Sequence, residues 1–250
     1  MKITVITACF NAEETLEDTL RSVLTQDHAD LEYIVMDGGS TDGSLQILER
    51  YRTQLTHLVS APDEGMYDAY NRGLQYATGD VVALLNADDM YANPQVLSLV
   101  AERFRQTCAD AVYGDLVYVG RENPSQVLRY WRSGFYRRER FKFGWMPPHP
   151  AFFLRREAYQ RYGGFDTRLQ SAADYELMLR MLYKHGLAAG WVPEVLVRMR
   201  SGGKSNATLR NRLFANREDR QAWVLNQIKP LPFTLLLKPL RKLPQFLIKP

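Results

Sequence analysis

Hydrophobic positions alternate between two spacings along the first 90 residues. Short apolar runs rich in β-branched residues, typical of buried strands, are followed by stretches whose apolar side chains recur at helical spacing. Strands and helices that alternate with short connections form βαβ units, in which helices cover both faces of a parallel sheet. The pattern therefore predicts an α/β fold with a mostly parallel, Rossmann-like sheet and flanking helices. The expected strands are residues 2–8, 31–36, 55–60 and 80–85, and the expected helices are residues 15–26, 44–52 and 66–77.

The pattern is less regular after residue 90. Residues 121–145 form a basic and aromatic stretch without a clear period. No internal repeat or low-complexity tract divides the chain. The expected helices in this half are residues 93–105, 174–185 and 207–227, and the expected strands are residues 110–119, 151–154 and 190–199.

Polar residues follow each of the four strands predicted first. They are residues 7–11 after the first strand, Asp37 after the second, residues 62–65 after the third and residues 86–89 after the fourth. In an open parallel sheet the carboxyl ends of the strands lie along one edge, and ligands bind there. The sequence therefore predicts a ligand site at this edge.

Neither of the common glycine-rich phosphate-binding motifs is present. The first strand is not followed by G-x-G-x-x-G, and G-x-x-x-x-G-K-[ST] occurs nowhere in the sequence. A nucleotide diphosphate at the predicted edge would therefore need a divalent cation to neutralise it. Mg²⁺ and Mn²⁺ take one or two carboxylates and complete their shells with water and phosphate oxygens. Asp88 and Asp89 are the candidate ligands.

The composition is that of an ordinary globular protein, with 46% hydrophobic and 24% charged residues. Its two cysteines, Cys9 and Cys108, define no disulfide framework, and its four histidines show no metal-ligand spacing. We find no secretory leader and no run of about 18 apolar residues. These features predict a cytoplasmic protein without a membrane-spanning segment.

The net charge of +4 conceals two halves of opposite sign. Residues 1–120 contain 7 Lys and Arg against 19 Asp and Glu, whereas residues 121–250 contain 25 against 9. An acidic half that handles phosphates would need a metal ion, and a basic half suits anionic lipid, phosphate or nucleic acid. Two solvated surfaces that simply attract each other account for the same counts.

Several segments, in order along the chain, resemble the family 2 glycosyltransferases of the GT-A fold. The resemblance covers about residues 2–205. Its most specific part, SAPDEGMYDAYNRGLQYATGDVVALLNADDMY at residues 60–91, is similar to the subgroup that builds bacterial surface polysaccharides. Stacked motifs in family order are more specific than any one of them. The other segments are VITACFNAEETL, YIVMDGGSTDGS, HPAFFLRREAYQRYGGFD, SAADYELMLRM and RSGGKS.

The resemblance implies a domain organisation and a reaction. Residues 1–205 would form the glycosyltransferase domain, with a nucleotide-sugar-binding half at 1–120 and an acceptor-binding half at 121–205. Residues 206–250 would form a C-terminal helix and a basic, apolar tail. The implied reaction is inverting transfer of a sugar from a nucleotide diphosphate donor, expected to be a UDP-sugar, to a hydroxyl of a glycan or lipid-linked glycan in surface-polysaccharide synthesis, with Mg²⁺ or Mn²⁺ as cofactor.

The resemblance also assigns roles to residues at the predicted edge. Thr7, Asn11 and Glu13 match the family's first nucleotide-binding loop. Asp37 matches the carboxylate that reads the base, which in this family is commonly uracil.

In the metal-binding motif the chain departs from the family. Asp88 matches the last Asp of the D-x-D motif, the direct metal ligand, but the first position is Asn86. An amide oxygen still accepts a hydrogen bond from a ribose hydroxyl or a metal-bound water, although it carries no charge. Asp88, helped by Asp89, is therefore the expected metal anchor, and a weaker metal affinity is expected.

Asp174 matches the family's catalytic base, which takes the proton of the attacking acceptor hydroxyl. Because it opens a predicted helix, capping that helix is the structural alternative. His149 matches a histidine near the active site of relatives, where it would touch a phosphate or the acceptor. A lone histidine after two prolines is otherwise a packed loop residue.

The segment 229–250, KPLPFTLLLKPLRKLPQFLIKP, has five cationic side chains and no acidic one. Its apolar clusters are too short and too interrupted by prolines to span a bilayer, but they suit an interfacial anchor beside anionic lipid. That anchor would place the protein peripherally on the cytoplasmic face of the inner membrane. A tail that packs on the domain or pairs a dimer is the alternative.

Two rival functions share some of these features. A sugar nucleotidyltransferase also uses a metal and carboxylates, but its first loop is usually glycine-rich and basic, whereas this one is CFNAEE. A nucleic-acid-binding module would stack bases on the aromatics of 121–145. The acidic first half would repel a phosphate backbone, so we expect no nucleic-acid partner.

Overall fold

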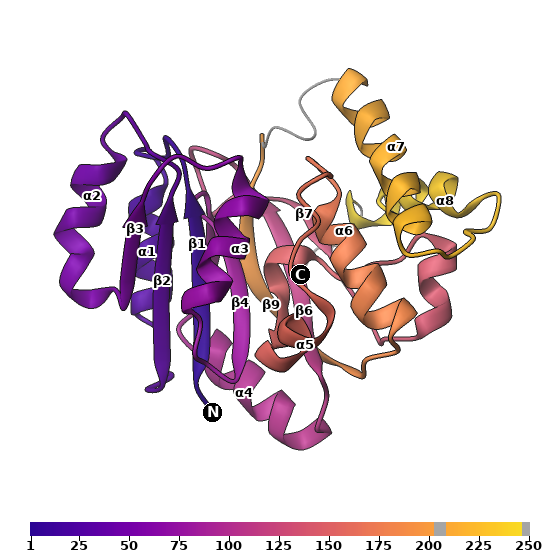
Figure 1. Cartoon of the computed structure of the whole chain (residues 1–250), viewed down its shortest axis with the longest axis horizontal. Coiled ribbons are helices and arrows are strands. Elements are labelled where there is room, and N and C mark those ends of the chain that lie inside the picture. The colour runs from indigo at the N-terminus through magenta and orange to yellow at the C-terminus, as the bar shows by residue number, and fades with distance from the viewer. Residues whose placement is uncertain (203–208, 247–250) are drawn as a thin grey trace.

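The computed structural model describes residues 1–202 and 209–246, with the side chains of 209–213 left out. In this part of the chain one mixed sheet forms the centre of the molecule (Figure 1). Its strands lie in the order β3-β2-β1-β4-β8-β6-β9-β5, and β7 pairs with β6 at the side. The strands are β1 (Ile3–Cys9), β2 (Leu31–Asp37), β3 (His57–Ser60), β4 (Val81–Asn86), β5 (Asp89–Tyr91), β6 (Ala111–Val119), β7 (Val127–Trp131), β8 (Phe152–Arg155) and β9 (Ala189–Arg200).

The first four strands form a continuous parallel unit. β1 pairs with β2 on one side and β4 on the other, and β3 pairs with β2, all in parallel register. Cys9 lies opposite Asp37, which lies opposite Ser60, and Ala8 lies opposite Asn86. The carboxyl ends of the four strands are therefore level at one edge, as the sequence predicted.

The second half of the sheet is mixed. β8 is antiparallel to both β4 and β6, whereas β9 is parallel to β6. β5 follows β4 after two residues, yet it pairs with β9 at the far end of the strand order. The chain thus leaves the sheet after Asn86, and residues 86–89 bridge its two halves.

Helices cover both faces of the sheet (Figure 1). One core contains residues of α1, α2 and α4, and the other contains residues of α3, α5, α6 and α7. β1 contributes to both cores, Val5 to the first and Ile6 to the second, because successive side chains of a strand point to opposite faces. The helices are α1 (Leu16–Leu24), α2 (Ser44–Tyr51), α3 (Met66–Tyr76), α4 (Val96–Thr107), α5 (Arg156–Tyr162), α6 (Ala173–Met178), α7 (Leu209–Leu225) and α8 (Thr234–Leu240). Shorter helical segments are 3₁₀ turns at Arg52–Gln54, Arg138–Phe143, His149–Ala151 and Leu243–Phe246, and a π-helical stretch at Leu179–Lys184.

The predicted α/β class is confirmed, and every predicted element has a counterpart in the structure, with its ends shifted by a few residues. The expected helix 174–185 is a short α-helix continued by the π-helical stretch. The sequence analysis missed β5, β7, α5 and α8. Residues 207 and 208 of the last expected helix, and 203–205 of the RSGGKS segment, lie outside the described residues.

The C-terminal segment packs on the domain as far as it is described. Thr234 is completely buried, and its hydroxyl donates to the Lys142 carbonyl at 2.6 Å. Lys238 Nζ lies 2.6 Å from Asp219 Oδ1 and 3.7 Å from the centre of the Tyr175 ring. Packing of the tail on the domain is therefore confirmed for residues up to 246, and its contact with a membrane stays a prediction.

Within the described ranges no helix has both the length and the apolar content needed to cross a bilayer.

Candidate active site

The loops after β1 and β2 brace each other through side-chain-to-backbone hydrogen bonds. Asn11 Oδ1 accepts from the Thr41 N–H at 2.8 Å, and Glu13 Oε2 accepts from the Gly43 N–H at 2.6 Å. In return, the Asn11 N–H donates to Ser40 Oγ at 2.8 Å. Asn11 has a φ of 48°, the left-handed conformation that asparagine tolerates better than most residues. Asn11 and Glu13 therefore shape one continuous rim at the carboxyl edge.

The Asp37 carboxylate anchors the turn after β2. It is 2% exposed, and its Oδ2 accepts from the Gly39 and Ser40 N–H groups at 3.2 and 3.1 Å. The Ser60 hydroxyl donates to the same oxygen at 2.6 Å, which ties the end of β3 to this turn. The structure thus shows Asp37 engaged with protein groups. Its reading of a base stays a prediction.

The Thr7 side chain does not face the predicted ligand edge. It is completely buried, and its hydroxyl lies 3.1 Å from that of Tyr33 in the core beneath α1 and α2. The residue is buried as a whole and its strand pairs with β2 and β4 on either side, so its contact with a nucleotide stays a prediction.

Asn86 is held between a tyrosine and a buried carboxylate. The Tyr70 hydroxyl donates to Asn86 Oδ1 at 2.7 Å, and Asn86 Nδ2 donates to Asp89 Oδ2 at 2.9 Å. Asp89 is completely buried, and within residues 1–202 and 209–246 its Oδ1 has no hydrogen-bond partner. Burial and the nearby charge of Asp88 raise the pKa of Asp89. Among the described residues, Asn86 is the one side-chain donor to the Asp89 carboxylate, whereas an aspartate at position 86 would repel it.

Asp88 is the more accessible carboxylate of this loop. Its side chain is partly exposed. Burial raises the pKa of Asp88, and the charges of Arg121 and Arg200 oppose that rise. Arg200, only 3% exposed, donates from Nη1 to the Asp88 carbonyl at 3.0 Å and pairs with Asp18. The sequence analysis did not single out Arg200 as a site residue, although it begins the RSGGKS segment at the end of a predicted strand.

The acidic loop fits a divalent cation that also binds phosphate. No group of three or more His, Cys, Asp or Glu side chains capable of holding a metal occurs within residues 1–202 and 209–246. Mg²⁺ and Mn²⁺ need only one or two carboxylates when phosphate and water complete the shell. The Asp88 carboxylate is partly exposed, and within the described residues Oδ1 of Asp89 accepts no hydrogen bond, so both side chains have oxygens left to coordinate such a cation.

Asp174 lies at the second position of α6. The N-cap position is occupied by Ala172, so Asp174 is not the capping residue. Its Oδ1 accepts from the Tyr175 N–H at 2.8 Å, which satisfies one free donor of the first turn. The side chain is partly exposed. In the described part of the chain its second oxygen, Oδ2, makes no hydrogen bond.

One helix connects Asp174 with the acidic loop. Tyr67 and Tyr70 lie three residues apart on α3, and side chains at this spacing share a face of a helix. The Tyr67 hydroxyl donates to Asp174 Oδ1 at 3.4 Å, while the Tyr70 hydroxyl holds Asn86. α3 therefore positions the candidate base and the candidate metal loop together. The sequence analysis assigned no role to either tyrosine; their helical spacing was the available signal.

His149 is packed between aromatic rings. It is 7% exposed, and its ring lies 6.2 Å from Tyr70 and 5.9 Å from Phe165, in edge contacts. Burial lowers the pKa of His149, and the Asp174 carboxylate opposes this shift. The packing matches the structural alternative for this residue. Its Nε2 nevertheless has no hydrogen-bond partner, so contact with a phosphate or the acceptor stays a prediction.

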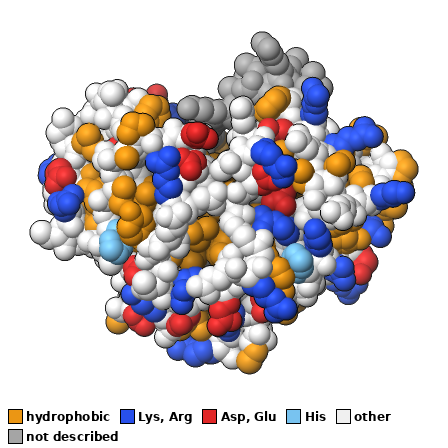
Figure 2. Space-filling view, in the orientation of Figure 1, with side chains coloured by type: hydrophobic (Ala, Val, Ile, Leu, Met, Phe, Trp, Pro, Cys, Tyr) orange, Lys and Arg blue, Asp and Glu red, His pale blue; other side chains and the backbone are white. Residues whose placement is uncertain are grey.

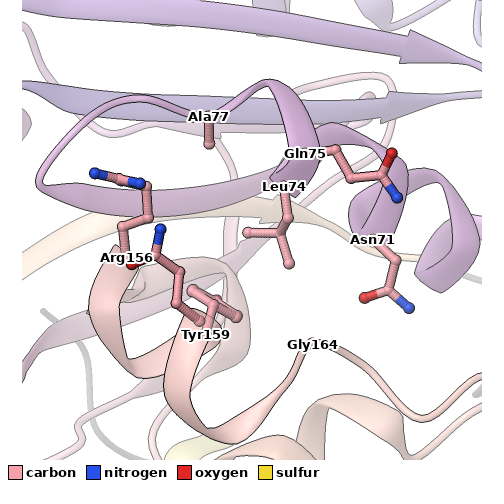
Figure 3. Close-up of a pocket in the computed structure, with 8 residues that line it drawn as sticks. Asn71, Leu74, Gln75, Ala77, Arg156, Tyr159 and Gly164 are labelled. Atoms are coloured by element: carbon pink, nitrogen blue, oxygen red, sulfur yellow. The ribbon is translucent and has the colours of Figure 1, made fainter.

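Two cavities lie away from this edge. One of about 490 Å³ opens between α3 and α5, with Leu74, Arg156 and Tyr159 in its wall (Figure 3). It lies toward the amino end of β4, because the Arg156 N–H donates to the Asp80 carbonyl at 2.9 Å. A second cavity of about 300 Å³ has Arg180 in its wall. Neither is lined by Asp88 or Asp174.

Two aromatic residues of the basic stretch 121–145 belong to the core, although most of the stretch is exposed or partly exposed. Phe141 and Trp145 are completely or almost completely buried, whereas Phe135 is 70% exposed. The Trp145 indole donates to the Ser133 carbonyl at 2.9 Å. These two aromatics therefore serve packing and are not available as a platform for bases or sugars.

A family model described as glycosyl transferase family 2 matches residues 4–163. The chain therefore belongs to family 2 of the glycosyltransferases, as the sequence motifs indicated.

Individual relatives and solved structures agree with this assignment. An uncharacterised glycosyltransferase of Mycobacterium tuberculosis is 31% identical over 180 residues, which cover 71% of this chain and 68% of that protein. A PGL/p-HBAD biosynthesis glycosyltransferase of Mycobacterium bovis is 28% identical over 217 residues, 85% of this chain and 82% of the relative. The fold is similar to that of S. aureus TarS in complex with UDP-GlcNAc, with a TM-score of 0.68 and 20% identity over 90% of this chain and 65% of the other. It is also similar to that of the mannosyltransferase PcManGT from Pyrobaculum calidifontis in complex with GDP-Man and Mn²⁺, with a TM-score of 0.67 and 23% identity over 94% and 68% of the two chains. These likenesses confirm the GT-A fold.

Proposed function

We propose that this chain transfers a sugar, with inversion, from a UDP-sugar to a hydroxyl of a glycan or lipid-linked glycan in surface-polysaccharide synthesis. One observation carries the proposal. Helix α3 joins the partly exposed Asp174 carboxylate, through Tyr67, to the acidic loop at the carboxyl edge of the sheet, through Tyr70. A carboxylate without a complete set of hydrogen bonds thus stands beside a loop suited to a cation and a diphosphate.

In this proposal the edge of the sheet binds the donor. Asp88, with Asp89 behind it, would hold Mg²⁺ or Mn²⁺, which when bound neutralises the diphosphate of the leaving nucleotide. The rim braced by Asn11 and Glu13 would take the nucleoside, with Thr7 and the turn anchored by Asp37.

Asp174 would act as the general base. The acceptor hydroxyl is a poor nucleophile until its proton is removed, and a positioned carboxylate removes it during attack on the anomeric carbon. Asp174 Oδ1 is occupied by the Tyr175 N–H, so Oδ2 is the oxygen that would take the proton. Direct displacement with one base inverts the anomeric centre and needs no covalent intermediate. His149, with its unpartnered Nε2, would contact a phosphate or the acceptor.

The proteins similar to this chain support the donor class and the setting. The TarS structure holds UDP-GlcNAc, the mannosyltransferase holds GDP-Man with Mn²⁺, and the mycobacterial relative is named for PGL/p-HBAD biosynthesis. We infer a nucleotide-activated sugar, with UDP as the first candidate and GDP as the second, and action on the cytoplasmic side of the membrane.

Hydrolysis of a panel of UDP- and GDP-sugars by the purified chain tests this function. We expect release of the nucleoside diphosphate from one or a few donors in Mn²⁺ or Mg²⁺, and loss of that release in EDTA. Conversion of the donor, with added pyrophosphate, into the nucleoside triphosphate and a sugar 1-phosphate would instead indicate a nucleotidyltransferase. With an acceptor in hand, the NMR coupling of the new anomeric proton reports the stereochemistry, and retention of the donor configuration would contradict the inverting mechanism.

A further inference from the structure

The C-terminal segment shows two sides of different character. Its inner side is fixed to the domain by buried Thr234, by partly buried Leu235 and by Lys238, which pairs with Asp219. Its outer side carries exposed large apolar side chains, distributed over the residue before α8, α8 itself and the 3₁₀ turn that follows. We call these residues the apolar row; they are Phe233, Leu236, Leu240, Leu243 and Phe246, between 43% and 65% exposed.

The row reverses the usual arrangement of a surface helix. Outer helix positions normally carry polar side chains, and apolar ones face the core. Here a threonine and a lysine face inward, and three of the most exposed leucines in the described chain face outward. A contiguous exposed apolar surface marks contact with a protein or a membrane.

The charges beside the row select between these partners. No acidic residue follows Asp219, whereas Lys229 and Arg241 are exposed and Lys242 is partly exposed. None of these three cations forms an ion pair within the described residues. In Figure 2 the right-hand side of the molecule, where Figure 1 places α7 and α8, shows hydrophobic side chains next to Lys and Arg. Apolar side chains that enter the acyl boundary and cations that meet phosphate groups are the features of an interfacial segment.

We propose that the apolar row, with Lys229, Arg241 and Lys242, is a docking surface for an anionic lipid bilayer. The row would lie in the interface and not cross it. Through Lys238, which lies over the Tyr175 ring, the docked segment is attached to α6, the helix that carries Asp174. Docking would therefore bring the acceptor side of the site toward the membrane. This orientation rests on the proposed function, whereas the docking itself does not.

Vesicle co-sedimentation of the full chain tests the surface. We expect binding to vesicles of phosphatidylcholine with phosphatidylglycerol, and much weaker binding to phosphatidylcholine alone. The combined variant Leu236→Gln, Leu240→Gln, Leu243→Gln should lose at least about tenfold in affinity, because its apolar area no longer enters the interface. Lys229→Gln with Arg241→Gln should lose about 20- to 30-fold, since each cation near anionic lipid contributes about 1 kcal/mol. The matched control is Leu99→Gln on α4, an exposed leucine outside the row, which should bind as the unmodified chain does.

Three outcomes overturn the proposal. The first is a triple variant that binds anionic vesicles within about twofold of the unmodified chain at an unchanged melting temperature. The second is equal binding of the unmodified chain to neutral and anionic vesicles. The third is a dimer in sedimentation velocity that the triple variant dissociates without loss of vesicle binding, which would assign the row to a second copy of this chain. Hydrolysis of the donor without vesicles is measured in parallel; its absence in the unmodified chain would count against the proposed function and leave the docking result intact.

Discussion

Asn86 determines the hydrogen bonding and the charge of the acidic loop after β4 when no cation is bound. Its amide donates to Asp89 and accepts from Tyr70, so the loop holds a buried carboxylate next to a neutral partner. Family members with an acid at this position would place two carboxylates side by side. The departure from the D-x-D motif therefore lowers the number of charges that a cation has to neutralise.

Asn86→Asp tests this reading of the loop. Without metal the variant should lose about 1–3 kcal/mol of stability, because Asp89 loses its donor and gains a like charge. Mn²⁺ should restore part of that loss, so the difference between melting temperatures with and without Mn²⁺ should be larger than in the unmodified chain. An identical metal response in the two proteins would contradict the assignment of this loop to a cation.

Asp174→Asn separates the base from the scaffold. The amide oxygen keeps the bond to the Tyr175 N–H, so the melting temperature should change little. Donor affinity should also persist, since Asp88 and the rim are untouched. Transfer to the acceptor should fall by about 10²- to 10⁴-fold, the usual contribution of a positioned general base. Glu157→Gln, an exposed acid in the first turn of α5, is the control and should keep full turnover. Near-normal turnover in Asp174→Asn would remove this residue from the mechanism.

At the scale of elements, Glu32 ties the amino ends of β1 and β2 to the turn before β4. It is 2% exposed and accepts hydrogen bonds from Lys2 and Thr4 at 2.8 and 2.6 Å and from the Thr78 N–H at 2.7 Å. Burial alone would raise the pKa of Glu32, but these hydrogen bonds outweigh it and lower the pKa to about 2.

This shift predicts how stability depends on pH. Because the folded pKa is below the ordinary value of 4.5, the contribution of Glu32 is complete above that pH and is lost as the pH falls toward 2. The free energy of unfolding, measured with urea, should therefore fall more steeply between pH 4.5 and pH 2 in the unmodified chain than in Glu32→Gln. Glu49→Gln, whose surface pair with Arg52 is exposed, should follow the unmodified curve. Parallel curves for all three proteins would contradict this role of Glu32.

Contact between α8 and the loop at residue 144 holds the C-terminal segment in place. A Cβ atom at Gly144 would lie 2.5 Å from the Lys238 backbone nitrogen, and the residue has a φ of +74°. Gly144→Ala should therefore lower the free energy of unfolding by about 3 kcal/mol or more, because backbone strain and displacement of α8 add together. Gly186→Ala is the matched control, because its φ is +69° but its nearest neighbour is a side-chain atom at 3.9 Å.

The control variant Gly186→Ala should lower the free energy of unfolding by only about 1–2 kcal/mol. Hydrogen exchange should accelerate in residues 229–246 of Gly144→Ala and not of Gly186→Ala. Equal stability of the two variants would show that the packing of α8 contributes little to the fold.

On the scale of the whole molecule, the acidic first half carries the carboxyl edge of the sheet, which is the proposed donor edge, and the basic second half carries the C-terminal segment. A nucleotide diphosphate that approaches the donor edge alone meets like charge, and a cation removes that repulsion. Metal and nucleotide should therefore bind as a pair.

Thermal unfolding measures this coupling. With UDP at about 100 times its dissociation constant in Mn²⁺, the stabilisation should be about 2.7 kcal/mol, or roughly 5–10 °C for a chain of this size. UDP in EDTA, or Mn²⁺ alone, should give less than half of that shift. A full shift by UDP in EDTA would show that the nucleotide does not need the metal. The thermal shift with GDP in Mn²⁺, measured on the same preparation, is compared with the shift with UDP to test the second donor class.

Local patterns in the sequence determined the elements of the first half and the position of the ligand edge. Apolar periodicity depends on which side of an element meets the core, and parallel βαβ units leave all strand ends on one side. Asp88, Asn86, Asp37 and Asn11 were therefore located from the sequence, as was Asp174, from the resemblance of its segment to family 2.

Tertiary structure alone decided which groups those residues contact. Thr7 faces Tyr33 because side chains alternate along a strand whose sheet is covered on both sides. Asn86 meets Tyr70 only after α3 packs on β1 and β2. β5 was missed because three residues carry no period, and it forms only by pairing with β9, about a hundred residues later in the chain. The tail shows the same limit: its composition suits both an anchor and a packed segment. Contacts between residues far apart in sequence fixed one side of it to the domain and left the other side free.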